Sequence, residues 1–98
     1  MRRPDPRQAL FDLGDFVVET EVAALLPFAR VQEIIRRHAR CDWGRVPASR
    51  KKENDAFAHP KNRAFGSSAV SVHIVSNAQI CTITRQAKGR RYTRLFLL

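Results

Sequence analysis

The stretch SAVSVHIVSNAQICTIT, residues 68–84, decides the fold of this chain. Valine and isoleucine occupy every second position from 70 to 74, while Ser71 and His73 fall between them. Strict alternation places the two sets on opposite faces of an extended chain, which predicts a half-buried strand over 68–75. We expect the polar face, with His73, to be exposed.

A second strand follows a short turn. The dipeptide Ser76-Asn77 is typical of a tight turn, although it lacks the favoured Gly. The β-branched run at 80–84 predicts the second strand, and a turn at Gly89 leads to a third strand over 92–98. The C-terminal part of the chain therefore reads as a three-stranded antiparallel meander.

The preceding part of the chain is helical. We expect a turn at Gly14, a short extended piece at 16–18, and a short helix capped by Thr20 that ends at Pro27. A second helix is predicted over 28–40 and a third through about Phe57. The second helix carries an apolar stripe at positions i, i+3, i+4 and i+7, namely Val31, Ile34, Ile35 and His38. The fold class predicted is α+β, with three short helices followed by the meander and packed on one of its faces.

The chain of 98 residues is long enough for one domain. Residues 1–9 contain two prolines and three arginines, and we expect a flexible basic arm there, followed by a single α+β domain over 10–98. No apolar run approaches the length of a membrane span, and the basic N-terminus is not followed by an apolar signal segment. These observations predict a cytoplasmic protein with no membrane partner.

The two cysteines, Cys41 and Cys81, are too few for a disulfide scaffold. We expect both to be reduced, buried thiols. His38 and Cys41 have an H-x-x-C spacing, but no second pair of ligands completes a zinc site. We therefore expect no metal. No glycine-rich loop is present, so we expect no nucleotide cofactor either.

Positive charge is concentrated in the C-terminal half. The chain has 18 Lys+Arg and 9 Asp+Glu, and its formal net charge is +9. No carboxylate side chain follows Asp55, and five basic residues lie between 85 and 94. A field of one sign attracts polyanions or acidic protein surfaces. Nucleic acid is therefore the first candidate partner, and an acidic protein surface is the second.

An aromatic residue lies within this basic segment. On a strand, Arg90, Tyr92 and Arg94 share one face, and we expect them to form an exposed row above buried Leu95 and Leu97. Cations that hold phosphates beside an aromatic ring that stacks on a base are typical of nucleic-acid binding. Basic residues at the start of the third helix oppose its macrodipole and add a weaker signal. The candidate binding residues are Arg85, Lys88, Arg90, Arg91, Tyr92, Arg94, Lys51 and Lys52.

Four residues around the break after the second helix are predicted to be structural. We expect His38 to be a hydrogen-bonded core residue and Trp43 to be a core plug that fixes the loop. Asp42 follows the helix, and Gly44 can adopt the positive φ that ends such a segment.

The pattern His38-x3-Asp42-Trp43-Gly44, followed by Glu53-Asn54 and a C-terminal β-hairpin, resembles a small family of bacterial plasmid and mobile-element proteins. Members of that family are often named after neighbouring restriction–modification genes, and their role is not established. The resemblance implies a cytoplasmic accessory protein and no catalytic residues. Cys41 stands where the family usually has Gly, and a basic segment at 85–91 replaces the family's acidic one.

Three functions are compatible with the sequence. The first is a non-enzymatic accessory protein that binds nucleic acid through phosphates with little sequence preference. The alternative is a protein-binding inhibitor of a host defence or transfer complex. The second alternative is a small ribonuclease-type toxin in which His59 or His73 is the acid/base. The apolar C-terminus, Leu95 to Leu98, also predicts an open strand edge on which a homodimer would form.

Overall fold

The computed structural model describes residues 11–58, 68–87 and 89–98, and within them it has an α+β fold. The predicted arm at 1–9, His59 and Lys88 lie outside the described residues. The helices are α1 (Thr20–Leu25), α2 (Phe28–Ala39) and α3 (Ala48–Ala58), and the strands are β1 (Asp15–Val18), β2 (Ser68–Val75), β3 (Ala78–Ala87) and β4 (Arg90–Leu97). Thr20 is the first residue of α1 and not its cap, because Glu19 occupies the N-cap position.

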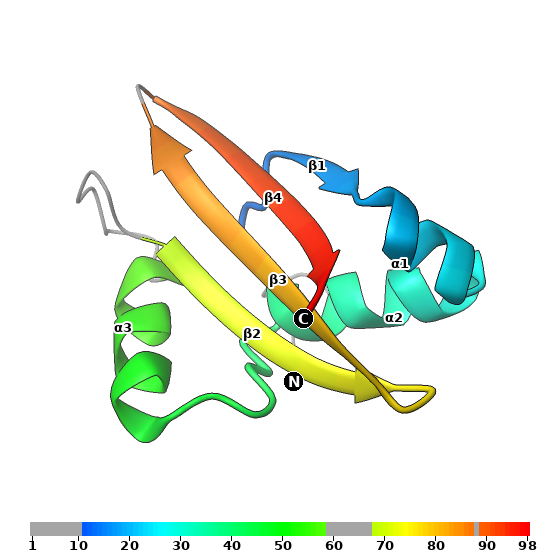
Figure 1. The fold of residues 1–98 in the computed structure, drawn as a ribbon. Coiled ribbons are helices and arrows are strands. Elements are labelled where there is room, and N and C mark those ends of the chain that lie inside the picture. Colours follow the sequence, from blue (N-terminus) through cyan, green and yellow to red (C-terminus); the bar gives the residue numbers. More distant parts are fainter. Residues whose placement is uncertain (1–10, 59–67, 88) are drawn as a thin grey trace, which may run out of the picture.

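The sheet has four strands and is mixed, so the predicted three-stranded meander is incomplete. The strand order is β1-β4-β3-β2 (Figure 1). β3 pairs antiparallel with both β2 and β4. β1 pairs parallel to β4, from Asp15 beside Tyr92 to Val18 beside Leu95. The short extended piece expected at 16–18 is therefore the fourth strand. Its partner lies more than 70 residues away, and local sequence patterns contain no information on such a pairing.

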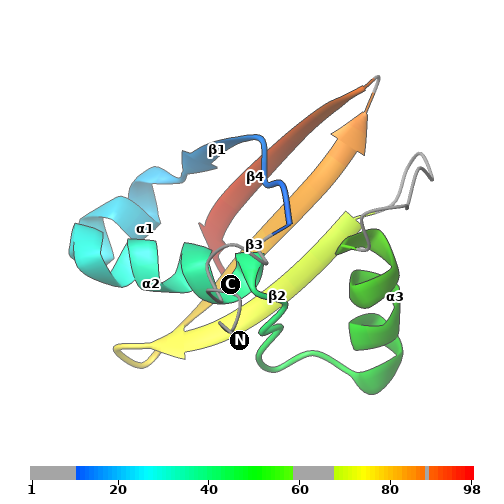
Figure 2. The ribbon, with the colours of Figure 1, turned by 180° about the vertical axis from the view of Figure 1, so that it is seen from behind.

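Helices α1 and α2 cover one face of the sheet, as the two opposite views show (Figures 1 and 2). Helix α3 flanks β2 instead. The core between the sheet and the first two helices consists of Val22, Leu26, Val31, Ile34, Ile80 and Leu95. A second cluster of Phe11, Trp43, Phe57 and Ala69 joins α3 to the same side of the sheet. No helix of the described residues lies on the opposite face. None of the helices in the described ranges is long and apolar enough to cross a membrane.

The two faces of β2 are the reverse of what the alternation predicts. Ser71 and His73 are buried beneath the helices, whereas the valine and isoleucine side chains at 70–74 lie on the uncovered face. Three threonines of β3 and β4, Thr82, Thr84 and Thr93, are buried on the helix side as well. Polar groups can be buried at low cost only when they find hydrogen-bond partners.

His38 on α2 begins the hydrogen bonds that allow these polar side chains to be buried, and His38 itself is 0% exposed. Thr93 Oγ1 donates to the Leu13 carbonyl (2.8 Å), so the hydroxyl of Thr84 donates to Thr93 (2.7 Å). Thr84 then accepts from His38 Nε2 (2.9 Å), and Ser71 Oγ donates to Nδ1 (2.6 Å). This chain of hydrogen bonds fixes one neutral tautomer of His38 and connects α2 to three strands. The prediction that His38 is a hydrogen-bonded core residue is confirmed.

The loop after α2 is a Schellman motif. The amide of Asp42 donates to the Arg37 carbonyl (2.9 Å) and the amide of Cys41 to the His38 carbonyl (3.0 Å). Cys41 adopts a φ of 66°, a conformation that favours glycine. Its side chain is exposed, contrary to expectation, because the left-handed residue of this motif points outward; Cys81 is buried as expected, and both thiols are free.

Trp43 is buried, as expected, and its Nε1 donates to Asp55 on α3 (2.8 Å). The next residue, Gly44, adopts a φ of 70° and forms a parallel bridge with Val72. A Cβ at Gly44 would lie 2.0 Å from the Val72 carbonyl oxygen, so only glycine allows the loop to approach β2 this closely. Asp42 is exposed, where its carboxylate accepts a hydrogen bond from Arg37 (2.8 Å).

The outer edge of β2 is closed by two different devices. The Asn54 side chain of α3 donates to the Val70 carbonyl (2.6 Å) and accepts from the Val70 amide (2.9 Å). The backbone around Gly44 pairs with Val72 in the same way. The open edge predicted at Leu95–Leu98 is closed at Leu95, where β1 ends, and the β1 pairing does not extend to the last three residues. The outer edge of β1 itself has no strand partner among the described strands.

Candidate nucleic-acid interface

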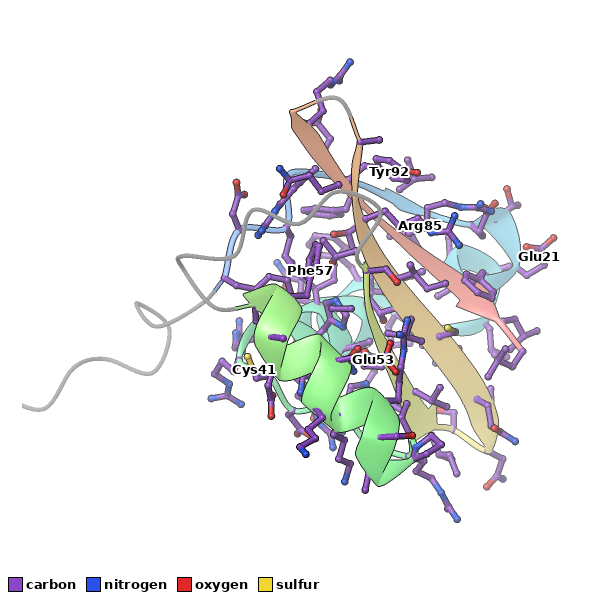
Figure 3. The ribbon with its side chains drawn as sticks, turned by 90° about the vertical axis from the view of Figure 1, so that its left-hand side faces the viewer. Glu21, Cys41, Glu53, Phe57, Arg85 and Tyr92 are labelled. Atoms are coloured by element: carbon purple, nitrogen blue, oxygen red, sulfur yellow. The ribbon has the colours of Figure 1, made fainter. Side chains whose placement is uncertain are left out.

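One row of side chains crosses the uncovered face of the sheet. In the strand register Ser68 pairs with Arg85, Arg85 with Tyr92, and Tyr92 with Asp15. Residues directly opposite each other on neighbouring strands point to the same face with their Cβ atoms about 5 Å apart. Arg85 and Tyr92 are therefore direct neighbours on the two inner strands, at the end of this face nearest the β3–β4 turn (Figure 3).

Tyr92 has cations on both sides along its own strand. Arg90 and Arg94 lie two residues before and after it, and all three side chains are exposed. The predicted row on β4 is thus present in the structure. Leu95 is fully buried beneath it, but Leu97 is 41% exposed, contrary to the expectation that both leucines are buried.

A small hollow of about 80 Å³ lies beside this row. Ile83, Arg85, Tyr92, Arg94 and Phe96 surround it. Phe96 was not among the predicted binding residues. It shares the face of Tyr92 because it is four residues further along the same strand, and this even spacing is the signal that points to it. The Arg94 guanidinium lies 5.8 Å from the Phe96 ring centroid.

Arg50 brings a further cation to this face from α3. Its guanidinium donates to Ser68 Oγ (2.9 Å), and Ser68 is the residue opposite Arg85. The same group forms an ion pair with Glu53 (2.9 Å). In sequence, Arg50 is recognisable only as one of several basic residues at a helix N-terminus. The structure separates it from its neighbours Lys51 and Lys52, which are exposed on α3 beyond the β2 edge and take no part in the row.

Two acidic residues, one in β1 and one directly after it, partly neutralise the positive charge of the row. Arg90 pairs with Asp15 (3.3 Å) and Arg94 pairs with Glu19. The Arg90 pair is more than 80% exposed on both sides, and exposed ion pairs contribute little stability and exchange partners readily. Arg85 forms no ion pair with any residue in the described ranges.

Arg91, one of the candidate binding residues, lies outside the row. It points to the opposite face, where its guanidinium lies 4.6 Å from the Phe57 ring centroid. It also donates to Gln86 (2.9 Å) and to the Asp12 carbonyl (2.9 Å). Because neighbouring residues of a strand alternate in direction, Arg91 is a packing residue that connects α3 with the segment before β1.

His73, the histidine considered as an acid/base, is 2% exposed. Its Nε2 donates to the Asp42 carbonyl (2.8 Å), and burial lowers its pKa, an effect reinforced by the charge of Arg37. The expectation that His73 lies on an exposed polar face is wrong, because the helices cover that face of β2. A substrate at the surface does not reach this ring.

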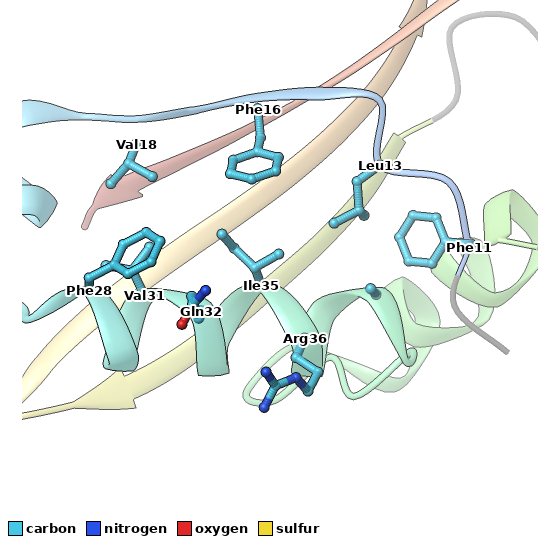
Figure 4. Close-up of a pocket in the computed structure, with 10 residues that line it drawn as sticks. Phe11, Leu13, Phe16, Val18, Phe28, Val31, Gln32, Ile35 and Arg36 are labelled. Atoms are coloured by element: carbon cyan, nitrogen blue, oxygen red, sulfur yellow. The ribbon is translucent and has the colours of Figure 1, made fainter. Parts of the chain in front are cut away.

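A separate apolar groove of about 330 Å³ runs between β1 and α2 (Figure 4). Leu13, Phe16 and Val18 form its upper side, and Phe28, Val31 and Ile35 of α2 form its lower side. Phe16 is 52% exposed and Phe28 is 72% exposed. The groove lies directly beside the unpaired edge of β1 and on the opposite side of the sheet from Tyr92.

Comparisons with models of protein families, with curated proteins and with solved structures find no match to this chain.

Proposed function

We propose that this chain is a non-enzymatic protein that binds nucleic acid on the uncovered face of its sheet. The observation that carries the proposal is the position of Tyr92. Tyr92 is 40% exposed on the face that no described helix covers, with Arg85 opposite it and Arg90 and Arg94 on either side. An aromatic ring among guanidinium groups matches the chemistry of a base and its flanking phosphates.

The ion pairs on this face are compatible with phosphate binding. Phosphate oxygens replace the exposed carboxylates of Asp15 and Glu19 at Arg90 and Arg94, since neither pair is buried. Guanidinium contacts to phosphates do not distinguish bases, so the binding is tolerant of sequence. The resemblance to mobile-element proteins is compatible with an accessory protein of this kind.

A salt series of binding titrations tests the proposal. We expect micromolar affinity for a short oligonucleotide at low salt that weakens steeply toward physiological salt. If Arg50, Arg85, Arg90 and Arg94 each neutralise one phosphate, the logarithm of the binding constant falls with a slope of about 3 against the logarithm of salt concentration. Absence of binding at low salt contradicts the proposal.

Charge reversal locates the surface. The triple variant Arg85→Glu, Arg90→Glu, Arg94→Glu is expected to lose binding and to remain folded, because all three side chains are exposed. The matched control reverses Arg36, Arg40 and Lys52, which are equally exposed but lie on α2, its C-terminus and α3. Both variants have the same net charge. Equal losses of affinity would show that net charge, and not this face, governs binding.

The groove beside β1 favours a second candidate function, which is docking of a protein strand. An unpaired strand edge accepts another strand through backbone hydrogen bonds, and an apolar groove receives its alternate side chains. Such docking is compatible with the alternative of an inhibitor protein. The simplest occupant is β1 of a second copy. Sedimentation equilibrium is expected to show a dimer, and Phe28→Glu, on the exposed rim of the groove, is expected to dissociate it. A monomeric wild type contradicts this candidate.

A further inference from the structure

We infer that the nucleic acid bound on this face is single-stranded, with one base stacked on Tyr92. The inference rests on the proposed function and specifies its ligand. It follows from the shape of the face, the position of the aromatic ring and the distribution of charge.

The shape of the face does not fit a duplex groove. Four strands at the usual spacing of about 4.8 Å form a face about 14 Å wide between the outer strands, before side chains are added. The major groove of B-DNA is about 12 Å wide and receives a helix or a two-stranded ribbon. Arg85 and Tyr92 lie on the two inner strands with Ser68 of β2 and Asp15 of β1 beside them, so the outer strands keep this row from entering a duplex groove. A single strand presents unstacked bases to a flat surface and has no such restriction.

Tyr92 is suited to stack on an unpaired base. Its ring is exposed, and the small hollow beside it has Ile83 and Phe96 as apolar neighbours. Arg85 on β3 and Arg90 on β4 place guanidinium groups on different sides of the ring. The phosphates before and after a stacked base therefore both have a cation within reach. Stacking on an aromatic ring is tolerant of sequence, because every base has a π face.

The charges also indicate the direction of the strand. A shallow depression continues from the hollow toward the far end of β4, where Glu19 and Glu21 line it. Glu19 is paired with Arg94 there, but Glu21 has no ion pair with any described residue, and its carboxylate repels phosphates. In the other direction, across the strands, the row leads from Tyr92 through Arg85 to Arg50 on α3. A single strand therefore runs from Tyr92 across β3 toward Arg50 and does not continue along β4 beyond Arg94.

The experiment compares a short mixed-sequence single strand with the duplex of the same sequence, both at low salt, by fluorescence anisotropy. The single strand is expected to bind at least tenfold more tightly. Tyr92→Leu keeps an apolar side chain on the strand but removes the ring, and it is expected to lower single-strand affinity by about tenfold or more. Tyr92→Phe keeps the ring and is the matched control, with affinity close to that of the wild type.

The outcomes separate this inference from the proposed function. Equal or tighter binding of the duplex, or an unchanged affinity of Tyr92→Leu for the single strand, overturns the inference and leaves nucleic-acid binding in place. Absence of binding to either ligand overturns both. Circular dichroism of each variant verifies the fold, which the exposed position of Tyr92 is expected to preserve.

Discussion

The stability of this fold is expected to depend on the protonation of His38. Burial lowers the pKa of His38 from 6.5 to about 3, and repulsion by His73 contributes in the same direction. Above pH 6.5 the ring is neutral in both the folded and the unfolded chain. Between pH 6.5 and pH 3 the unfolded chain binds a proton that the folded chain does not, so the free energy of unfolding falls as the pH falls.

The magnitude follows from the two pKa values. Between pH 7 and pH 4, proton binding to the unfolded chain at this one residue removes about 3 kcal/mol of folding stability. That loss is large for a domain of this size, since native proteins are stable by only about 5–15 kcal/mol. It arises mainly because burial removes the protonated ring from water, and the charge of His73 adds to the penalty.

The assay is urea denaturation at a series of pH values, followed by the fluorescence of buried Trp43. To isolate the contribution of His38 to the pH dependence, the wild type is compared with His38→Gln, which keeps an amide donor but does not titrate. The variant is expected to be less stable at pH 7 and to lose about 3 kcal/mol less than the wild type between pH 7 and pH 4. An NMR titration provides a check on the wild type alone. Native His38 resonances that titrate near pH 6.5, or equal pH dependence of the two proteins, would refute the reasoning.

Three further predictions concern backbone conformation. Cys41→Gly is expected to raise the free energy of unfolding by about 0.5–1 kcal/mol, because Cys41 has a φ of 66°, whereas Cys41→Ala is expected to give no gain. Gly44→Ala is expected to lower the free energy of unfolding by at least about 3 kcal/mol, because its Cβ would lie 2.0 Å from a β2 carbonyl oxygen. Gly89→Ala is the control: Gly89 also has a positive φ but faces open space, so the expected loss is only about 1 kcal/mol. Similar losses of unfolding free energy at both sites would contradict the close approach of Gly44 to β2. Replacing Ser76-Asn77 with Asn-Gly is expected to raise the melting temperature, because both residues have positive φ in this hairpin turn; an unchanged temperature would contradict a type I′ geometry.

The local elements of this fold are predictable from sequence. The apolar stripe on α2 and the hairpin turn at Ser76-Asn77 appear where the periodicity and turn chemistry place them. The parallel pairing of β1 with β4 is not predictable in this way, because it depends on contacts between distant segments. The burial of the polar face of β2 is also not predictable from the sequence. Alternation shows that two faces differ, but which face the helices cover depended on His38 and its hydroxyl partners.

The candidate site shows the same division. The shared face of Arg90, Tyr92 and Arg94 follows from the period of a strand, and the structure has it. The same period separates Arg91 from them, as its contact with Phe57 shows. The position of Arg50 beside this face required the packing of α3 against β2, which no local pattern encodes.

The two edges of the sheet differ in whether they can pair with a further strand. Asn54 and the loop around Gly44 occupy the outward backbone groups of Val70 and Val72, which obstructs the addition of a strand along the centre of the β2 edge. The β1 edge is unpaired but only four residues long. Joining two copies through β1 uses up the free edge of each, and the product has no end from which a third copy can continue. Within the described part of the chain, edge-to-edge assembly therefore terminates at a closed pair, and this protects a small, strand-rich protein against fibre formation.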